Sequence, residues 1–223
     1  MTTTVAEATA ALRERLNEST ESQWTNLQLR RWLNEGIRDI ARRTRLYTDQ
    51  STQAVTANVG ELTLAANILA LEHELWKATA DTRKTPLEAR AFVGVMKYVN
   101  ETGADPGYYS TYGHPPTLKI QLWPTPTRAG TLYYYGPTLP ATMDVAGGTG
   151  NIDVIEGWLE VAYDYCEYMA LRKDRQREDW KDAFTLYEAK VQNMIDMFPT
   201  DEAPGEFMFT GTSLVPNWLS EFD

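Results

Sequence analysis

Residues 24–44 read WTNLQLRRWLNEGIRDIARRT and carry the most complete helix signature in the chain. Thr25 and Gln28 have the spacing of a capping box, and Trp24 and Leu29 flank it as a hydrophobic staple does. Apolar positions then recur every three or four residues, which predicts one buried face: Leu29, Trp32, Leu33, Gly36, Ile37 and Ile40. Gly36 lies inside that face, where its missing side chain lets another helix approach closely.

The other face of this helix carries basic side chains: Arg30, Arg31, Arg38, Arg42 and Arg43. A stripe of acids at spacings of four, four and three follows later in the chain: Glu156, Glu160, Asp164 and Glu167. A solvated surface explains such a stripe. It could also face the bore of a ring, or pair with a neighbour's basic face. If the stripe pairs with the basic face of a neighbouring subunit, the lateral contacts between subunits use Arg30, Arg38, Arg42, Glu156, Glu160 and Asp164.

Helical patterns stand on both sides of a β-rich region. Thr4 and Glu7 form a second capping box, which begins a helix that runs to about Asn17. After the flexible Gly147–Gly150 stretch, we expect a helix that Asp153 caps, with Glu156 at its third position. A last helix over residues 180–198 runs antiparallel to it, and Pro199 ends that helix.

The region between the helices alternates short apolar segments with turn residues. Residues 53–57 and 61–64 are expected to form a hairpin around Asn58-Val-Gly60, and residues 69–80 a strand, with a helix as the close alternative. Residues 87–99 are expected to form a short helix. Residues 118–122 and 131–135 are interpreted as two antiparallel strands joined by a Pro-rich turn.

These patterns predict an α+β fold, in which an antiparallel helical bundle carries an inserted β-rich region and an extended C-terminal arm. The expected boundaries are residues 1–47 for the first bundle helices, 48–143 for the β-rich insert, 144–198 for the helical hairpin that completes the bundle, and 199–223 for the arm.

The arm is broken by proline and glycine and has no Lys or Arg, yet it is rich in large apolar residues. A disordered tail is normally poor in such residues, because nothing buries them. We therefore expect another protein to cover the apolar anchors of the arm, which are Phe207, Phe209, Leu214, Val215, Trp218, Leu219 and Phe222.

Composition argues against several function classes. The net charge is −10, which is unfavourable for a general nucleic-acid binder, and nearly all of it lies in residues 144–223. One cysteine and two histidines leave few soft metal ligands, and no apolar run approaches the ~20 residues of a membrane span. We expect no metal, no cofactor and no membrane association, and a calcium or magnesium site built from carboxylates alone is the alternative that this composition leaves open.

Motif searches give no catalytic residues. The chain has no nucleophile elbow and no phosphate-binding loop, His73 lies between Glu72 and Glu74 as a surface trio would, and Cys166 sits on an apolar helix face. An aromatic central region keeps a glycan-binding or glycan-cleaving protein open as an alternative. Its leading members are Tyr108, Tyr109, Tyr112 and Trp123.

Three stretches taken together resemble the head-to-tail adaptor (connector) proteins of short-tailed, podovirus-like phages. They are residues 24–44, residues 116–126 with 132–136, and the helical pair at 163–173 and 180–190. The resemblance rests on the order of these stretches along the chain, and it covers most of residues 20–198.

This resemblance implies a non-enzymatic structural subunit of the virion neck, synthesised in the host cytoplasm. It implies a ring of twelve copies beneath the portal, a face that receives the tail tube or nozzle, and a C-terminal arm that reaches the portal or a neighbour. It also implies non-specific contact with passing dsDNA. The aromatic β-rich region, with Tyr108, Tyr109, Tyr112 and Trp123, is then the face turned to the tail. Another neck or tail subunit, not adjacent to the portal, is the remaining alternative.

Overall fold

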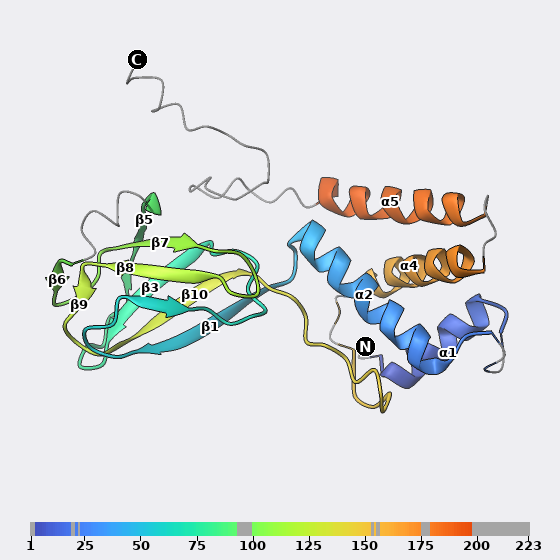
Figure 1. Ribbon diagram of the computed structural model, residues 1–223, viewed down its shortest axis with the longest axis horizontal. Coiled ribbons are helices and arrows are strands. Elements are labelled where there is room, and N and C mark those ends of the chain that lie inside the picture. Colours follow the sequence, from blue (N-terminus) through green and yellow to red (C-terminus); the bar gives the residue numbers. More distant parts are fainter. Residues whose placement is uncertain are drawn as a thin grey trace, which may run out of the picture.

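The computed structural model has a helical part and a β-rich part that lie side by side along its longest axis (Figure 1). It describes residues 3–18, 21, 23–92, 100–152, 154, 157–174 and 179–197. The chain enters the β-rich part after the second helix and returns to the helical part after strand β10. The predicted α+β class is confirmed.

The helices of the described chain are α1 (Val5–Arg15), α2 (Asn26–Thr44), α4 (Trp158–Lys173) and α5 (Asp179–Met197). Both predicted capping boxes are confirmed. The backbone N–H of Glu7 donates to Thr4 Oγ1 at 3.1 Å, and that of Gln28 donates to Thr25 Oγ1 at 3.3 Å. These bonds satisfy helix-end amides that would otherwise lack partners, so they fix where α1 and α2 begin.

The predicted apolar face of α2 is buried and packs against α4, with further contacts to α1 and α5. Gly36 lies where α2 and α4 meet: a Cβ at this position would be 2.9 Å from Cδ1 of Tyr165. The expectation that Gly36 admits a second helix is therefore confirmed. The helical core also takes side chains from the returning segment, Leu139, Met143 and Ile152.

Two four-stranded sheets form most of the described β-rich part. The first has the order β1 (Thr48–Val55), β10 (Gly130–Pro137), β3 (His73–Ala78) and β4 (Thr85–Pro86). The second has the order β2 (Glu61–Thr63), β8 (Lys119–Trp123), β7 (Tyr108–Tyr112) and β5 (Glu88–Ala89). A small parallel pair joins β6 (Thr102–Gly103) to β9 (Thr125–Pro126).

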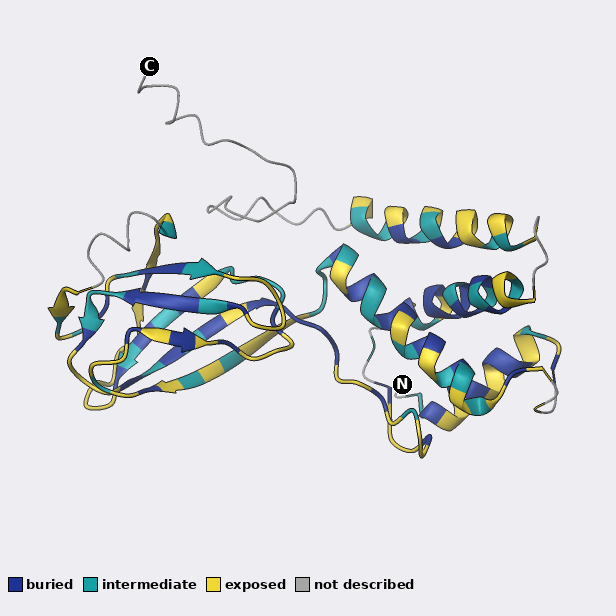
Figure 2. Cartoon of the chain, in the orientation of Figure 1, coloured by how far each residue is buried: buried dark blue, intermediate teal, exposed yellow. Residues whose placement is uncertain are grey.

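Side chains from both sheets form one hydrophobic cluster, separate from the helical core. Trp76 of β3 pairs in register with Leu132 of β10, and both are almost fully buried. Ile120 and Leu122 of β8 enter the same cluster from the other sheet. Figure 2 shows these buried stretches along the strands, while the outer positions and loops are exposed. The sheets therefore pack face to face over a shared core.

Both predicted hairpins are wrong. β1 pairs with β10 and β2 pairs with β8, so the turn at residues 58–60 carries the chain from one sheet to the other. Residues 118–122 and 131–135 contribute to β8 and β10, which also lie in different sheets. A turn signal shows that the chain reverses, but cross-strand packing of distant segments decides which strands pair.

Of the remaining secondary-structure predictions, one is confirmed, one is wrong at its start, and parts of others lie outside the described residues. The strand within residues 69–80 is confirmed as β3, and its helical alternative is wrong. The helix expected over residues 87–99 is wrong at its start, where β5 pairs in parallel with β7; residues 93–99 lie outside the described chain. Asp153, Ile155 and Glu156 also lie outside it, and α4 begins at Trp158 after Gly157, whose φ is 94°. Residue 157 therefore takes the N-cap position expected for Asp153.

Candidate interaction surfaces

Arg15 of α1 is held by three carboxylates of α4. Its guanidinium forms ion pairs with Glu160 at 3.4 Å, with Glu167 at 3.0 Å, and with Asp164. Asp164 is 1% exposed and also accepts a hydrogen bond from Lys190 Nζ of α5 at 2.6 Å. The acidic stripe thus holds α1, α4 and α5 together.

This arrangement corrects the interpretation of the stripe as a purely solvated surface. Asp164 is buried and has two partners within the chain, so its carboxylate is not exposed for a lateral contact with another subunit. Glu160 is largely exposed although it contacts Arg15. Glu156 lies outside the described residues.

Two of the three arginines expected at lateral contacts bind the segment that returns from the β-rich part. Arg38 donates to the carbonyl oxygen of Pro140 at 3.4 Å and to Thr142 Oγ1 at 3.1 Å. Arg30 donates to the carbonyl oxygen of Ala146 at 3.4 Å. Arg42 is exposed. Among these three side chains, Arg42 is the one most available to another molecule.

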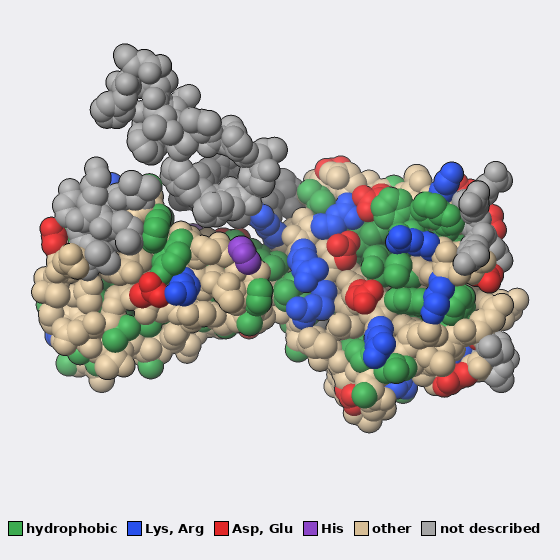
Figure 3. All heavy atoms as spheres, in the orientation of Figure 1, with side chains coloured by type: hydrophobic (Ala, Val, Ile, Leu, Met, Phe, Trp, Pro, Cys, Tyr) green, Lys and Arg blue, Asp and Glu red, His purple; other side chains and the backbone are tan. Residues whose placement is uncertain are grey.

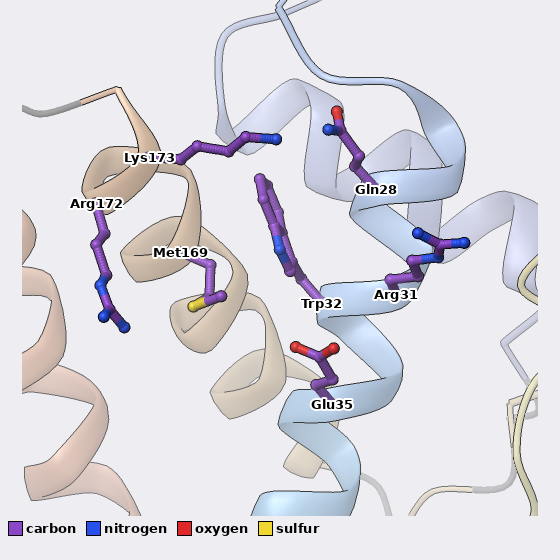
Figure 4. Close-up of a pocket in the computed structure, with 7 residues that line it drawn as sticks. All are labelled: Gln28, Arg31, Trp32, Glu35, Met169, Arg172 and Lys173. Carbon is purple, nitrogen blue, oxygen red and sulfur yellow. The ribbon is translucent and has the colours of Figure 1, made fainter.

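A groove of about 500 Å³ lies between α2 and α4. It is lined by Gln28, Arg31, Trp32, Glu35, Met169, Arg172 and Lys173, and we call it the α2–α4 groove. Figure 4 shows Met169 pointing from α4 toward the Trp32 ring and Lys173 extending across the groove toward Gln28. Arg31 and Arg172 lie at its outer sides. Three cations and one carboxylate surround an indole ring, which suits an acidic ligand that carries apolar groups.

An aromatic patch adjoins this groove on the side of α5. Tyr168 lies 4.9 Å from Phe184 and 6.1 Å from Trp180 between ring centroids. Arg172 donates to the Tyr168 hydroxyl at 2.8 Å and so links the patch to the groove. Figure 3 shows hydrophobic side chains gathered on the helical part with Lys and Arg beside them. Phe184 remains 38% exposed.

Strands β7 and β8 bring three of the four predicted aromatic residues to one face. Tyr108 stacks on Trp123 with ring centroids 4.9 Å apart, and Arg90 lies 4.8 Å above the Tyr108 ring. Tyr112 lies on the same side of β7 and hydrogen-bonds Glu61, which also accepts from Lys119 at 2.6 Å. Tyr109 points the other way, into the core between the sheets.

Tyr109 meets a buried acid there. Glu74 of β3 is 4% exposed, its side chain hydrogen-bonds Tyr109, and its Oε1 has no partner among the described residues. Burial, with a smaller contribution from Glu72, raises the pKa of Glu74 to about 7, although the Tyr109 bond acts in the opposite direction. His73 is exposed, so it faces away from Glu74.

The remaining features considered are the Cys166 thiol, possible metal-binding clusters and possible membrane-spanning helices. Cys166 is fully buried, and burial raises the pKa of its thiol well above the usual value, which leaves it protonated and unreactive. Within the described residues, no group of three or more His, Cys, Asp or Glu side chains could hold a metal ion. In that same part of the chain, no helix is both long and apolar enough to cross a membrane.

Sequence reasoning placed Trp32 on a buried face but did not find the α2–α4 groove or the Glu74–Tyr109 contact. Both depend on residues more than thirty positions apart, which no local sequence pattern brings together. The predicted anchors of the C-terminal arm, from Phe207 to Phe222, lie outside the described residues.

Comparison with protein families identifies the family of this chain. The family model described as SU10 adaptor protein covers residues 3–208, which include both the helical part and the β-rich part. A search of curated proteins finds no match.

Proposed function

Because the chain belongs to the SU10 adaptor protein family, we propose that it forms a ring that joins the portal to the tail tube or nozzle of a short-tailed phage. Family membership makes it a phage adaptor, a structural protein of the virion neck that interacts with portal and tail components. The observation that carries the proposal is the extent of the match, which takes in every element the structure describes. No catalytic role is part of this proposal.

Lateral contacts in such a ring join two different faces of the subunit. Arg42 is exposed on α2, and Glu160 is 70% exposed on α4. Residues 144–223 carry 17 acids and 6 bases, while residues 1–143 carry 14 acids and 15 bases. We propose that this asymmetry lets one copy's basic face meet the next copy's acidic face, in a ring of twelve whose bore passes dsDNA without specific contacts. An antiparallel bundle of α1, α2, α4 and α5 would form its wall.

The β-rich part is proposed as the tail-facing region. The exposed side of β7 and β8 presents stacked rings at Tyr108 and Trp123, and a cation at Arg90 covers one of them. Aromatic rings with polar tips are favoured at protein interfaces, because one end is buried and the other stays wet. Tyr109 has a role in the core instead, beside Glu74.

The structure disfavours the glycan-cleaving alternative. Such an enzyme needs two carboxyl groups flanking a sugar, and Glu74 is buried between the sheets where a polysaccharide cannot reach it. The stacked Tyr108 and Trp123 leave a glycan-binding subunit as a second candidate, since flat rings stack on sugars.

Co-sedimentation of the full-length chain with the purified portal protein tests the proposed function. We expect a stable complex in which electron microscopy shows a ring at one end of the portal. Replacing Phe207, Phe209, Trp218 and Phe222 by Ala should abolish the complex while circular dichroism stays unchanged. The matched control replaces Thr210, Thr212, Thr200 and Ser220 by Ala and should assemble normally.

Two results would count against the proposal. The first is a wild-type chain that never co-sediments with the portal protein. The second is saturable binding to a host surface glycan by the wild-type chain, with Trp123 fluorescence quenched, and no portal complex.

A further inference from the structure

We propose that the α2–α4 groove is the docking site for residues 199–223 of a second copy of this chain. The inference rests on the proposed assembly of copies, and it deepens that proposal by naming the receiving surface. Residues 199–223 lie outside the described structure, so the argument uses their sequence and the geometry of the groove.

The groove has an apolar floor. Trp32 is 8% exposed, and Met169 points toward its ring from the facing helix. Trp24 packs edge-on against Trp32 with ring centroids 5.4 Å apart, which holds the indole in place. A side chain that enters the groove therefore meets a rigid aromatic surface and a flexible thioether, and this combination accepts varied apolar groups.

The rim of the groove is cationic. Lys173 Nζ lies 5.6 Å from the centre of the Trp32 ring and 5.4 Å from that of Trp24. Arg31 and Arg172 stand on its two sides. Among the described residues, no carboxylate lies within ion-pair distance of any of these three cations. Glu35 is the single acid of the lining.

The aromatic patch extends the apolar surface beyond Arg172. Tyr168 and Phe184 are in ring contact there, and Phe184 is 38% exposed. An extended segment with two apolar anchors and an acid between them would place the anchors on Trp32–Met169 and on Phe184, and the acid on Arg172. The surface thus specifies an acidic, aromatic-rich peptide.

Residues 199–223 have that chemistry. They contain no Lys or Arg and carry acids close to the aromatic side chains: Asp201, Glu202, Glu206, Glu221 and Asp223. Their aromatic residues are Phe207, Phe209, Trp218 and Phe222. Charge and apolar content therefore complement the groove.

The geometry of α5 favours a second copy as the source. The groove lies at the last turn of α4, close to where α5 begins, and α5 then runs away from it for 19 residues. At a rise of about 1.5 Å per residue, α5 is roughly 28 Å long, so the segment after Met197 starts about that far from the groove of its own copy. To reach the groove of its own copy, the segment would have to double back along the whole of α5, whereas in an assembly the groove of a neighbouring copy can lie beside the end of α5.

Photocross-linking of the full-length chain tests this placement. A benzophenone amino acid replaces Phe209, because benzophenone reacts readily with methionine side chains and Met169 lines the groove. Chains of natural isotopic abundance are mixed with ¹⁵N-labelled chains before the portal protein is added, and cross-linked peptides are identified by mass spectrometry. We expect heavy–light pairs that join position 209 to the peptide containing Met169.

Charge reversal gives the specificity control. The double change Arg172→Glu and Lys173→Glu should lower the yield of heavy–light pairs by about fivefold at low salt, because it removes attraction and adds repulsion. Arg83→Glu, an equally exposed cation of the β-rich part, should leave the yield unchanged.

The outcomes separate this inference from the proposed function. Cross-links that map elsewhere, that join only peptides of one isotope, or that keep their yield after the double charge reversal would overturn the groove assignment, even if the portal complex forms. If no portal complex and no heavy–light pairs form, the proposed assembly and the docking inference are both contradicted.

Discussion

Gly36 and Tyr165 mark the closest approach of α2 and α4, where a Cβ on residue 36 would lie 2.9 Å from Cδ1 of Tyr165. It would also lie 3.1 Å from the Tyr165 Cβ, which belongs to the rigid part of that side chain. Because the α2–α4 groove lies along the same helix pair, this contact sets the separation of its two walls.

Replacing Gly36 by Ala should therefore destabilise the chain. Alanine gains helix propensity, but the overpacking against Tyr165 outweighs that gain, for a net loss of roughly 1 kcal/mol in the free energy of unfolding. Urea denaturation followed by circular dichroism measures it. Gly107→Ala is the control, since nothing lies within 4 Å of a Cβ there, and its stability should stay the same or rise slightly. An equally stable Gly36→Ala chain would show that the helices are farther apart.

Much of the helical part could be predicted because its signals are local. Thr25, Gln28 and the spacing from Leu29 to Ile40 gave the start and buried face of α2, and Gly36 gave its contact with another helix. Such patterns depend on residues within a few turns of each other, and the helix period repeats several times along α2.

The strand pairing could not be predicted in the same way. Residues 53–55 pair with residues 130–132, far along the chain, although a turn signal stands directly after them. The site surfaces were missed for a related reason. Asp164 sits at a position that a helical pattern cannot distinguish from exposed neighbours, and only the approach of Arg15 and Lys190 shows that it is buried.

The buried Glu74 should make folding stability depend on pH. Its pKa is about 7 in the folded chain against an ordinary value of 4.5, so the folded state binds the proton more tightly than the unfolded state. This contribution is fully present below pH 4.5 and is lost as pH rises through about 7. The loss amounts to about 3 kcal/mol, as a shift of one unit corresponds to about 1.4 kcal/mol.

Glu74→Gln should remove that dependence. The variant should unfold at a higher urea concentration than the wild type at pH 8, and at a similar concentration at pH 4.5. Glu101→Gln, a change at an exposed acid that does not contribute to the raised pKa of Glu74, is the control and should keep the wild-type profile. Parallel pH profiles for the wild type and Glu74→Gln would rule out Glu74 as the source.

Asp164→Asn should weaken the contact of α1 and α5 with α4. The change leaves Arg15 and Lys190 without their shared buried partner, although both cations can still reach water. We expect a loss of about 2 kcal/mol in the free energy of unfolding. Glu160→Gln, at a largely exposed position, should cost less than about 0.5 kcal/mol. Equal losses for the two variants would show that Asp164 is no more important than its exposed neighbour.

Arg42→Glu should weaken self-association through the proposed lateral contact. Arg42 is the suitable site because Arg38 is occupied within the chain. Sedimentation velocity should show a weakening of about tenfold at low salt that shrinks toward 1 M salt, where charges are screened beyond about 3 Å. Arg83→Glu should have no effect. A loss for Arg42→Glu that is the same at every salt concentration would argue against charge pairing.

Cryo-electron microscopy of intact particles tests the central claim most directly. The account predicts that this chain fits a ring of density in the neck between portal and tail, with the helical part forming the wall and β7 and β8 turned toward the tail. Density for this chain in the tail fibres or the capsid shell, with none between portal and tail, would contradict it.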